Sequence, residues 1–341
     1  MGAATLVAAS SALAADASRS EATPVSAASA PARGTPVLRG RTADSREGNP
    51  LALRPLYVEP HGPARSQAVA WKRSRPDDAA LIARIAEQPQ ALWLGDWLRD
   101  VRGTAAARVR AARNAGSVPI LVAYNIPHRD CGYHSSGGAA SASAYRAWIA
   151  QLARAIGDAP AAVVLEPDAL AGIDCLPKSD RAERIALIRD AVTRLSALPQ
   201  TAVYIDAGNS SWIPAGRMAR RLKAAGIDRA RGFALNVSGF EPTARATAFG
   251  HAVSRRTGGA RFVIDTSRNG VGADGGGEWC NPSGRAIGEL PSTSTGDPLL
   301  DAYLWVKRPG ESDGSCNDGP PAGVWWPEYA LGLVQRAGST A

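Results

Sequence analysis

The sequence predicts a single α/β domain whose core is a distorted parallel (β/α) barrel. Short apolar runs of strand length alternate with helical patterns about eight times along the chain. This alternation is typical of parallel strands joined by crossover helices, and the repeat number favours a barrel over a doubly wound sheet. Neither G-x-G-x-x-G nor G-x-x-x-x-G-K-[ST] follows any of these runs, so neither nucleotide-binding fingerprint is present.

The expected strands are β-branched, apolar runs that stop at Gly, Pro or Asp. They cover residues 56–58, 91–94, 118–123, 161–165, 202–205, 233–237, 261–264 and 303–306. The expected helices place apolar residues on one face. They cover residues 77–88, 105–114, 141–157, 181–198, 215–225, 242–256 and 327–336. Two Gly-rich loops, 269–298 and 308–322, flank the last strand.

The first residues differ in composition from the rest of the chain. Residues 1–15 are small and apolar and end in Ala-Leu-Ala-Ala, which resembles the apolar core and cleavage site of a secretory signal without its basic start. Residues 16–50 are rich in Ala, Ser and Pro, as in a linker or a disordered lead. We therefore expect a secreted protein, extracellular or periplasmic, whose barrel domain spans residues 51–341.

The charge and the aromatic residues limit the kinds of partner. The net charge of +8 comes mainly from Arg mixed with Ala, Asp and Glu on helical segments, which indicates solvated faces and not a nucleic-acid footprint. No later stretch is apolar for long enough to span a membrane. Nine Trp outnumber the four Phe and the seven Tyr. Trp can be packing, but its flat ring also suits sugar binding.

The chain has four cysteines and no C-x-x-C pair, so we expect two disulfides and no metal site. Cys131 and Cys175 each follow a strand end that carries a candidate acid, and Cys280 and Cys316 lie in the C-terminal loops. Pairing them in this way would join loops at one edge of the barrel. Four buried thiols are the alternative, which an oxidising compartment disfavours.

Carboxylates recur where the expected strands end. Asp168 follows the strand 161–165, Asp206 and Asp265 end two later strands, and Asp130 lies a few residues beyond another. A lone Asp in such a place often caps a helix. Repeated acids at the carboxyl ends of parallel strands instead predict an active site. Two carboxyl groups across one bond are what glycoside hydrolysis requires.

Six motifs then appear in one order, and together they resemble family six of the glycoside hydrolases, the inverting cellulases. The resemblance covers about residue 50 to the C-terminus. The motifs are Tyr124-Asn-Ile-Pro-His-Arg-Asp-Cys131, Val164-Leu-Glu-Pro-Asp168, Tyr204-Ile-Asp-Ala-Gly208, Asp265-Thr-Ser-Arg-Asn-Gly270, Glu278-Trp-Cys-Asn281 and Lys307-Arg-Pro-Gly-Glu-Ser-Asp-Gly314.

The resemblance implies a role for each matching residue of the reaction centre. Asp168 matches the general acid, and Asp130 matches the neighbouring carboxylate that keeps this acid protonated and helps to relay a proton from water. Ser136 matches the residue that holds the nucleophilic water. Asp313 matches the residue debated as the catalytic base. Tyr124 matches the residue that crowds the reacting sugar and favours its distortion.

The resemblance also implies substrate-binding residues and both disulfides. Three indoles match sugar-stacking platforms, Lys307 and Glu311 match residues that hydrogen-bond glucosyl hydroxyls, and the pairs are Cys131–Cys175 and Cys280–Cys316. The indoles are Trp93, Trp212 and Trp279, and we also expect Asn209 and Asn236 to bind the substrate. The family commonly has His where Asn209 stands, and an amide cannot carry charge. We expect Asp206 to be structural or sugar-contacting, and Asp265 to pair with Arg268 at a loop root.

These features lead to one principal functional prediction. The chain would hydrolyse internal β-1,4-glucosidic bonds of cellulose or β-glucan by single-displacement inversion, as a monomer that needs no cofactor or metal. Short C-terminal loops favour an open cleft and internal cleavage. A chain-end-acting cellobiohydrolase of the same family and a non-catalytic polysaccharide-binding barrel are the alternatives. A nucleic-acid binder is a third, less favoured by the charge pattern.

Overall fold

Seven parallel strands form one sheet, and each strand pairs with its neighbours in sequence order. The structure, a computed structural model, describes residues 48–273 and 279–337. The strands are β1 (Leu92–Leu94), β2 (Ile120–Ala123), β3 (Ala161–Leu165), β4 (Thr201–Asp206), β5 (Gly232–Leu235), β6 (Arg261–Asp265) and β7 (Leu300–Leu304). The predicted fold class, a distorted parallel (β/α) barrel, is confirmed.

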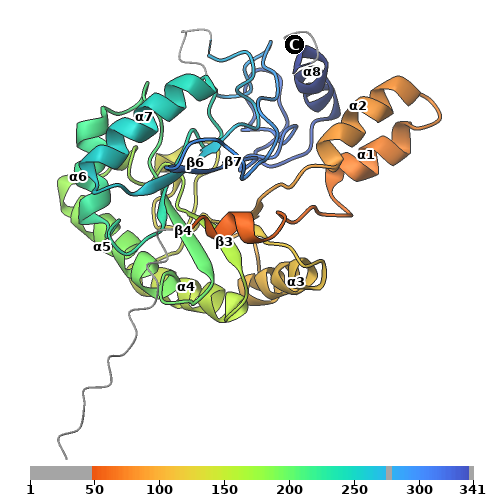
Figure 1. Cartoon of the computed structure of the whole chain (residues 1–341). Helices are drawn as coiled ribbons and strands as arrows, with labels where there is room; N and C mark the ends of the chain where they lie inside the picture. Colours follow the sequence, from red (N-terminus) through yellow and green to blue (C-terminus); the bar gives the residue numbers. More distant parts are fainter. Residues whose placement is uncertain (1–47, 274–278, 338–341) are drawn as a thin grey trace, which may run out of the picture. The chain divides into compact units, whose positions relative to one another are not determined.

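Helices connect β1 to β6 in succession and cover the outer face of the sheet (Figure 1), whereas the described residues between β6 and β7 contain no helix. The α-helices are α1 (Pro63–Trp71), α2 (Pro76–Ala86), α3 (Val101–Asn114), α4 (Ala142–Ile156), α5 (Lys178–Leu195), α6 (Ala215–Ala224), α7 (Thr243–Arg256) and α8 (Pro327–Ala337). Three short 3-10 helices are η1 (Pro50–Leu53), η2 (Asp130–Gly132) and η3 (Ile173–Cys175). The expected leader, residues 1–15, and most of the expected linker, 16–50, lie outside the described residues.

Alternating side chains of each strand divide the interior into two cores. Val163 and Leu165 of β3 pack outward against the helices, whereas Ala162 and Val164 point into the barrel. The same period of two runs through β2 and β4, because successive strand residues point to opposite faces. Both faces are covered, so the strands are apolar throughout.

Isolated hydrogen bonds, and not a regular strand pairing, link the β1 region to the residues that follow β7. The amide of Ala91 donates to the Trp305 carbonyl at 3.1 Å, and the indole N–H of Trp93 donates to the Val306 carbonyl at 2.8 Å. The expected first strand, 56–58, is wrong as a strand, because only Leu56 forms a bridge, to Val118. Pro55 and Pro60 flank this stretch, and proline cannot donate to a ladder.

Helix α1 is the element that the sequence pattern did not predict. It buries only two small residues, Ala64 and Ala68, so its apolar stripe is weak. Together with α2 it forms a helical pair beside α8 (Figure 1), around a third core that includes Ile82, Ile85 and Trp305. Tertiary packing thus stabilises a helix whose own amphipathic signal is small.

A substitution at Gly232 tests whether the close approach of β5 and β6 requires a glycine. A Cβ atom at this position would lie 1.9 Å from the backbone carbonyl oxygen of Arg261. We expect Gly232→Ala to force the two strands apart and to lower the free energy of unfolding by about 3 kcal/mol or more. Urea denaturation followed by circular dichroism measures this loss.

Gly216 in α6 provides the matched control. The nearest atoms to a Cβ placed there are side-chain nitrogens of Arg220 and Arg256 at 3.9 and 4.0 Å. Gly216→Ala should leave the stability unchanged or raise it by up to about 1 kcal/mol, because alanine restricts the unfolded chain. Equal midpoints for the two variants would contradict the steric argument at Gly232.

Candidate active site

Asp168 lies just beyond the carboxyl end of β3, on a backbone turned sharply by two residues in the left-handed region. Glu166 has a φ of 52° and Asp168 a φ of 69°. The Asp168 amide donates to Asp206 Oδ2 at 3.0 Å, which fixes this turn. Non-glycine residues with positive φ are uncommon and gather at functional sites. The turn therefore places the Asp168 carboxyl at the barrel edge.

The surroundings of Asp168 favour its protonated form. Burial, followed by the negative charges of Asp130 and Asp313, raises the pKa of Asp168 to about 7. The Tyr124 hydroxyl lies 3.5 Å from Asp168 Oδ2 and acts in the opposite direction. A carboxyl group with this pKa keeps a proton near neutrality, as a general acid must.

Asp130 lies on the loop that follows β2, in a run of residues with positive φ. His128, Asp130 and Cys131 have φ values of 56°, 54° and 51°. The Ser135 amide donates to Asp130 Oδ2 at 2.7 Å, but burial outweighs this bond and raises the pKa of Asp130. Ser136 is exposed, and its carbonyl accepts from Arg129. The loop thus brings a second weakly acidic carboxyl group into the field of Asp168.

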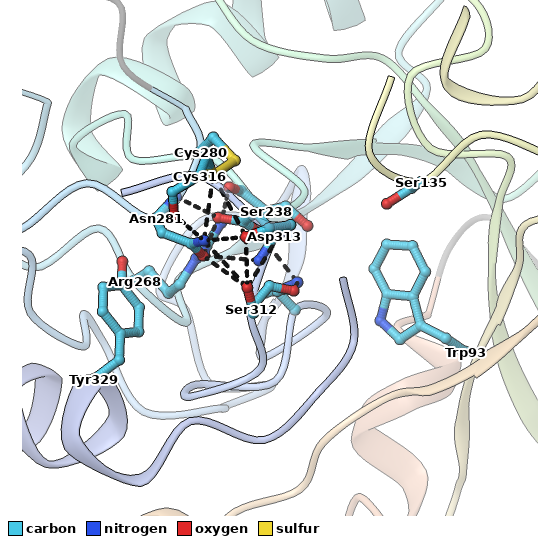
Figure 2. Close-up of polar contacts among 12 residues, drawn as sticks. Trp93, Ser135, Ser238, Arg268, Cys280, Asn281, Ser312, Asp313, Cys316 and Tyr329 are labelled. Atoms are coloured by element: carbon cyan, nitrogen blue, oxygen red, sulfur yellow. Dashed lines mark hydrogen bonds and ion pairs between the residues drawn. A yellow bond between two sulfur atoms is a disulfide. The ribbon is translucent and has the colours of Figure 1, made fainter. Parts of the chain in front are cut away.

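Asp313 has the opposite environment and lies in a dense polar network (Figure 2). Arg268 contacts one carboxylate oxygen at 2.7 Å and Lys307 the other at 3.1 Å. Asn281 holds both ends of the residue, because its amide donates to the carboxylate and its side-chain oxygen accepts from the Asp313 amide. Burial raises the pKa of Asp313, but the two cations outweigh it and lower the pKa to about 2.

The expected ion pair of Asp265 with Arg268 is wrong. Arg268 pairs with Asp313, whereas the Asp265 carboxylate accepts from the backbone amides of Ser238, Ser267 and Lys307. Proximity in sequence suggested the pairing, yet the side chain of Arg268 extends to the loop after β7. A buried guanidinium needs a buried partner, and the tertiary structure supplies Asp313.

Three buried carboxylates at the strand ends bind backbone amides of neighbouring loops. Asp265 holds the loop after β7 and the loop after β5. Asp206 holds the amides of Asp168 and Gly208. Glu166 holds the amides of Asn125 and Ile126. Sequence analysis did not select Glu166, although an acid directly after a buried strand and before proline was a usable signal.

The predicted sugar platforms lie at different depths. Trp93 is half-buried, and its ring meets Tyr124 edge-on with centroids 5.1 Å apart. Trp212 is 48% exposed and rests its ring near Gly172 and Gly208, which have no side chain to displace it. Trp279 is 50% exposed. Exposed indoles supported from one side are suited to stacking on sugar rings.

The four polar residues predicted to bind substrate lie in different surroundings. Lys307 and Glu311 are side chains near the Asp313 loop, and Glu311 pairs with Arg308 at 2.8 Å. Asn209 accepts from the amides of Ser211 and Trp212, so its oxygen orients the Trp212 platform. Asn236 is fully buried.

The side chain of Asn236 holds backbone groups in this structure, and its role in substrate binding stays a prediction. Its side-chain nitrogen donates to the Asp265 carbonyl and its oxygen accepts from the Glu241 amide. The amide group therefore holds the loop after β5.

Both expected disulfides are confirmed. Cys131–Cys175 joins the Asp130 loop to η3, and Cys280–Cys316 joins the two C-terminal loops beside Asp313. Each pair has a Cα–Cα separation of 6.2 Å. The first bridge spans 44 positions, and closing such a loop is worth roughly 4 kcal/mol in the chain-entropy model. The bridges restrict the loops that carry the acids.

The loop that follows β2 contacts the loop that follows β6 through aromatic side chains. The ring centroids of Tyr133 and Trp279 are 6.4 Å apart, and those of His134 and Trp279 are 5.9 Å apart. The His134 ring also fills the space where Gly314 lacks a side chain. Tyr133 is 66% exposed. The contact therefore consists of side chains at the surface, and each aromatic pair adds only about 1 kcal/mol.

Residues 48–273 and 279–337 contain one cluster of potential metal ligands, formed by His134, Cys280 and Cys316. Both sulfur atoms are in the disulfide, so neither can act as a thiolate ligand. In the same part of the chain, no helix combines the length and the apolar composition needed to cross a bilayer.

Comparison with known proteins identifies relatives of this chain. The model of glycosyl hydrolases family 6 matches residues 51–337. Endoglucanase 1 of Streptomyces halstedii is 47% identical over 291 residues, which cover 82% of this chain and 88% of that protein. Endoglucanase A of Cellulomonas fimi is 46% identical over 271 residues, covering 79% of this chain and 59% of that protein, so the match spans less than two thirds of its length.

A solved structure extends the comparison to three dimensions. It is the endoglucanase Cel6 from Mycobacterium tuberculosis in complex with methyl-cellobiosyl-4-deoxy-4-thio-β-D-cellobioside. The sequence identity is 47% and the TM-score 0.81, over 85% of this chain and 100% of the other. At this level the two chains share the fold described above.

Proposed function

Because this chain belongs to glycosyl hydrolases family 6, we propose that it is an endoglucanase that hydrolyses internal β-1,4-glucosidic bonds of cellulose or a related β-glucan with inversion. The observation that carries the proposal is the pair of environments at the barrel edge. Burial and the nearby carboxylates raise the pKa of Asp168 to about 7, whereas Arg268 at 2.7 Å and Lys307 at 3.1 Å lower the pKa of Asp313 to about 2. Carboxyl groups whose pKa values differ in this way can act as acid and as charged partner in one reaction.

In this mechanism Asp168 gives its proton to the glycosidic oxygen as the bond to the anomeric carbon breaks. Water attacks that carbon from the opposite face, and its proton leaves to a base. Asp313 holds charge well, but a carboxylate with a pKa of about 2 accepts a proton poorly. The raised pKa of Asp130 makes it the stronger base. We therefore assign the relay to Asp130 through solvent at Ser136, and charge stabilisation to Asp313.

The substrate side of the proposal rests on the exposed rings. Trp212 and Trp279 offer stacking surfaces, and Trp93 borders Tyr124, which reaches toward the acid. Lys307 binds Asp313 at 3.1 Å, and Glu311 pairs with Arg308 on the same loop. Because every anchor is either a flat ring or a hydrogen-bonding side chain, the site is suited to a neutral glucan chain.

Internal cleavage follows from how the loops meet. The contact of Tyr133 and His134 with Trp279 consists of surface side chains, and its aromatic pairs add about 1 kcal/mol each, so a polymer can displace it and enter from the side. The relatives named endoglucanases, at 46% and 47% identity, support the same conclusion. The chain-end-acting alternative would need a roof that stays closed.

We propose further that the protein is secreted and acts as a monomer on the polysaccharide. Two disulfides support an oxidising compartment. Reducing-sugar release from carboxymethylcellulose, with xylan and chitin as controls, tests the function as a whole. Binding of carboxymethylcellulose without any release would support the non-catalytic alternative.

Asp168→Asn should remove protonation of the leaving oxygen and lower kcat by about 10²–10⁴-fold on cello-oligosaccharides. The loss should be much smaller on a 2,4-dinitrophenyl β-cellobioside, whose leaving group needs no proton. The wild-type rate on cello-oligosaccharides should also fall as the pH rises through about 7, because the acid must be protonated. Equal losses on both substrates would contradict the assignment of Asp168.

The first product released from a β-linked glucan should carry the α-configuration at its new reducing end. A single displacement by water inverts the anomeric carbon. Proton NMR during the first minutes of cellohexaose hydrolysis, before mutarotation, distinguishes the two anomers. A β-anomer at the earliest time would refute the single displacement.

The viscosity of carboxymethylcellulose should collapse while few new reducing ends have appeared. Cleavage inside a chain shortens the polymer at once, whereas cleavage from an end does not. Viscometry and a reducing-end assay on one reaction mixture measure both quantities. A slow fall in viscosity with cellobiose as nearly the sole early product would favour the chain-end-acting alternative and leave the family assignment intact.

A further inference from the structure

The loop between Tyr124 and Asp130 is held by two buried ionisable side chains, Glu166 and Arg184. The Glu166 carboxylate accepts from the Asn125 amide at 3.1 and 3.0 Å and from the Ile126 amide at 3.0 Å. Arg184 of α5 donates from one terminal nitrogen to the carbonyls of Pro127 at 2.7 Å and His128 at 2.8 Å. The carboxylate thus binds the amides of the loop and the guanidinium binds its carbonyls.

Neither charge is available to a substrate. Glu166 is 1% exposed and Arg184 is 3% exposed. Each would be costly to bury alone, but they attract one another, and both are hydrogen-bonded to backbone. Burial raises the pKa of Glu166 to about 7, and Arg129 from the loop, Tyr145 from α4 and Tyr124 also interact with this group.

The loop needs this support because of its backbone. His128, Asp130 and Cys131 are all in the left-handed region, which is disfavoured for residues other than glycine. Such conformations persist where the surroundings overdetermine them. The amide of Ala139 donates to the Asn125 carbonyl at 2.8 Å, and Arg129 donates to the Tyr124 carbonyl at 2.9 Å, so further backbone groups of this segment are hydrogen-bonded.

Glu166 also links the two sides of the reaction centre. It lies two residues before Asp168 at the end of β3, and it holds the residues that follow Tyr124. The Tyr124 hydroxyl reaches Asp168, and the same loop carries Asp130. The distance from the acid to Tyr124 and Asp130 therefore depends on one carboxylate that touches neither.

We propose that Glu166 and Arg184 are positioning residues, which act through the loop 125–128 to place Tyr124 and Asp130 against Asp168. The proposal rests on the proposed function, since it assigns these residues to that reaction. Misplacement of reacting groups by about 1 Å can lower a rate by about 10²-fold.

Glu166→Gln tests the carboxylate. It preserves the shape of the side chain but replaces one acceptor oxygen with a donor, which then faces an amide. We expect kcat on cellotetraose to fall by about 10–100-fold with KM changed by less than about 3-fold. Because Asp168 keeps its proton, the fall should be similar on a 2,4-dinitrophenyl β-cellobioside, unlike that of Asp168→Asn.

Arg184→Lys tests the guanidinium and covers the case in which Glu166→Gln does not fold. A lysine can reach only one of the two carbonyls with good geometry, so kcat should fall by about 3–10-fold, again with little change in KM. Arg189→Met is the matched control on the same helix, because Arg189 is exposed and bonds the Ala224 carbonyl, away from the site. Its kcat should equal that of the wild type.

The outcomes separate the two proposals. Assays run at least about 15 °C below the unfolding midpoint of each variant exclude losses that come from stability alone. Folded Glu166→Gln and Arg184→Lys variants with wild-type kcat would overturn the positioning role while the endoglucanase function stood. A rise in KM at constant kcat would also overturn it, because that result indicates a binding role. A wild-type protein that releases no reducing sugar would overturn the proposed function itself.

Discussion

Buried carboxylates that accept backbone amides from neighbouring loops are the constraint on which the rest of this site depends. All the strands are parallel, so their carboxyl ends meet at one edge, where the sheet hydrogen bonds stop and loop amides lose their partners. Glu166, Asp206 and Asp265 replace those partners across adjacent strands. An unpaired buried amide costs roughly 1–3 kcal/mol, so these acids determine where each loop begins.

Two aspartates at this edge, Asp168 and Asp313, have opposite electrostatic environments. Asp168 has no cation beside it and lies in the field of two other carboxylates, whereas Asp313 lies between Arg268 and Lys307. Desolvation raises the pKa of both, but only Asp313 has cations that outweigh it. The barrel edge thus holds a weak acid and a fixed anion together, which is the combination that bond cleavage at a glycosidic oxygen needs.

Rigidity is distributed unevenly around this centre. Disulfides and buried hydrogen bonds hold the loops that carry Asp130 and Asp313, while the contact of Tyr133 and His134 with Trp279 consists of exposed side chains. A disulfide contributes several kcal/mol to stability, whereas a surface aromatic pair contributes about 1 kcal/mol. The aromatic contact is therefore the weaker of the two kinds of link between these loops.

The sequence by itself determined the parallel barrel, the residues at the strand ends and both disulfide pairs, because these depend on local periodicity and on a fixed order of motifs. The strand 161–165 has the predicted bounds. Helix α1 could not be predicted in this way, because its two buried alanines pack only once α2 and α8 are in place.

Only the tertiary structure decided which charges pair and which polar groups face outward. Arg268 is three positions from Asp265 in sequence, yet it binds Asp313, 45 positions away. Asn236 is polar and close to the site, yet it lies wholly inside a loop. Glu166 and Arg184 act on one loop from two elements that only the fold brings together. Pairing energies depend on distance and burial in three dimensions, and neither quantity can be read from the order of residues along the chain.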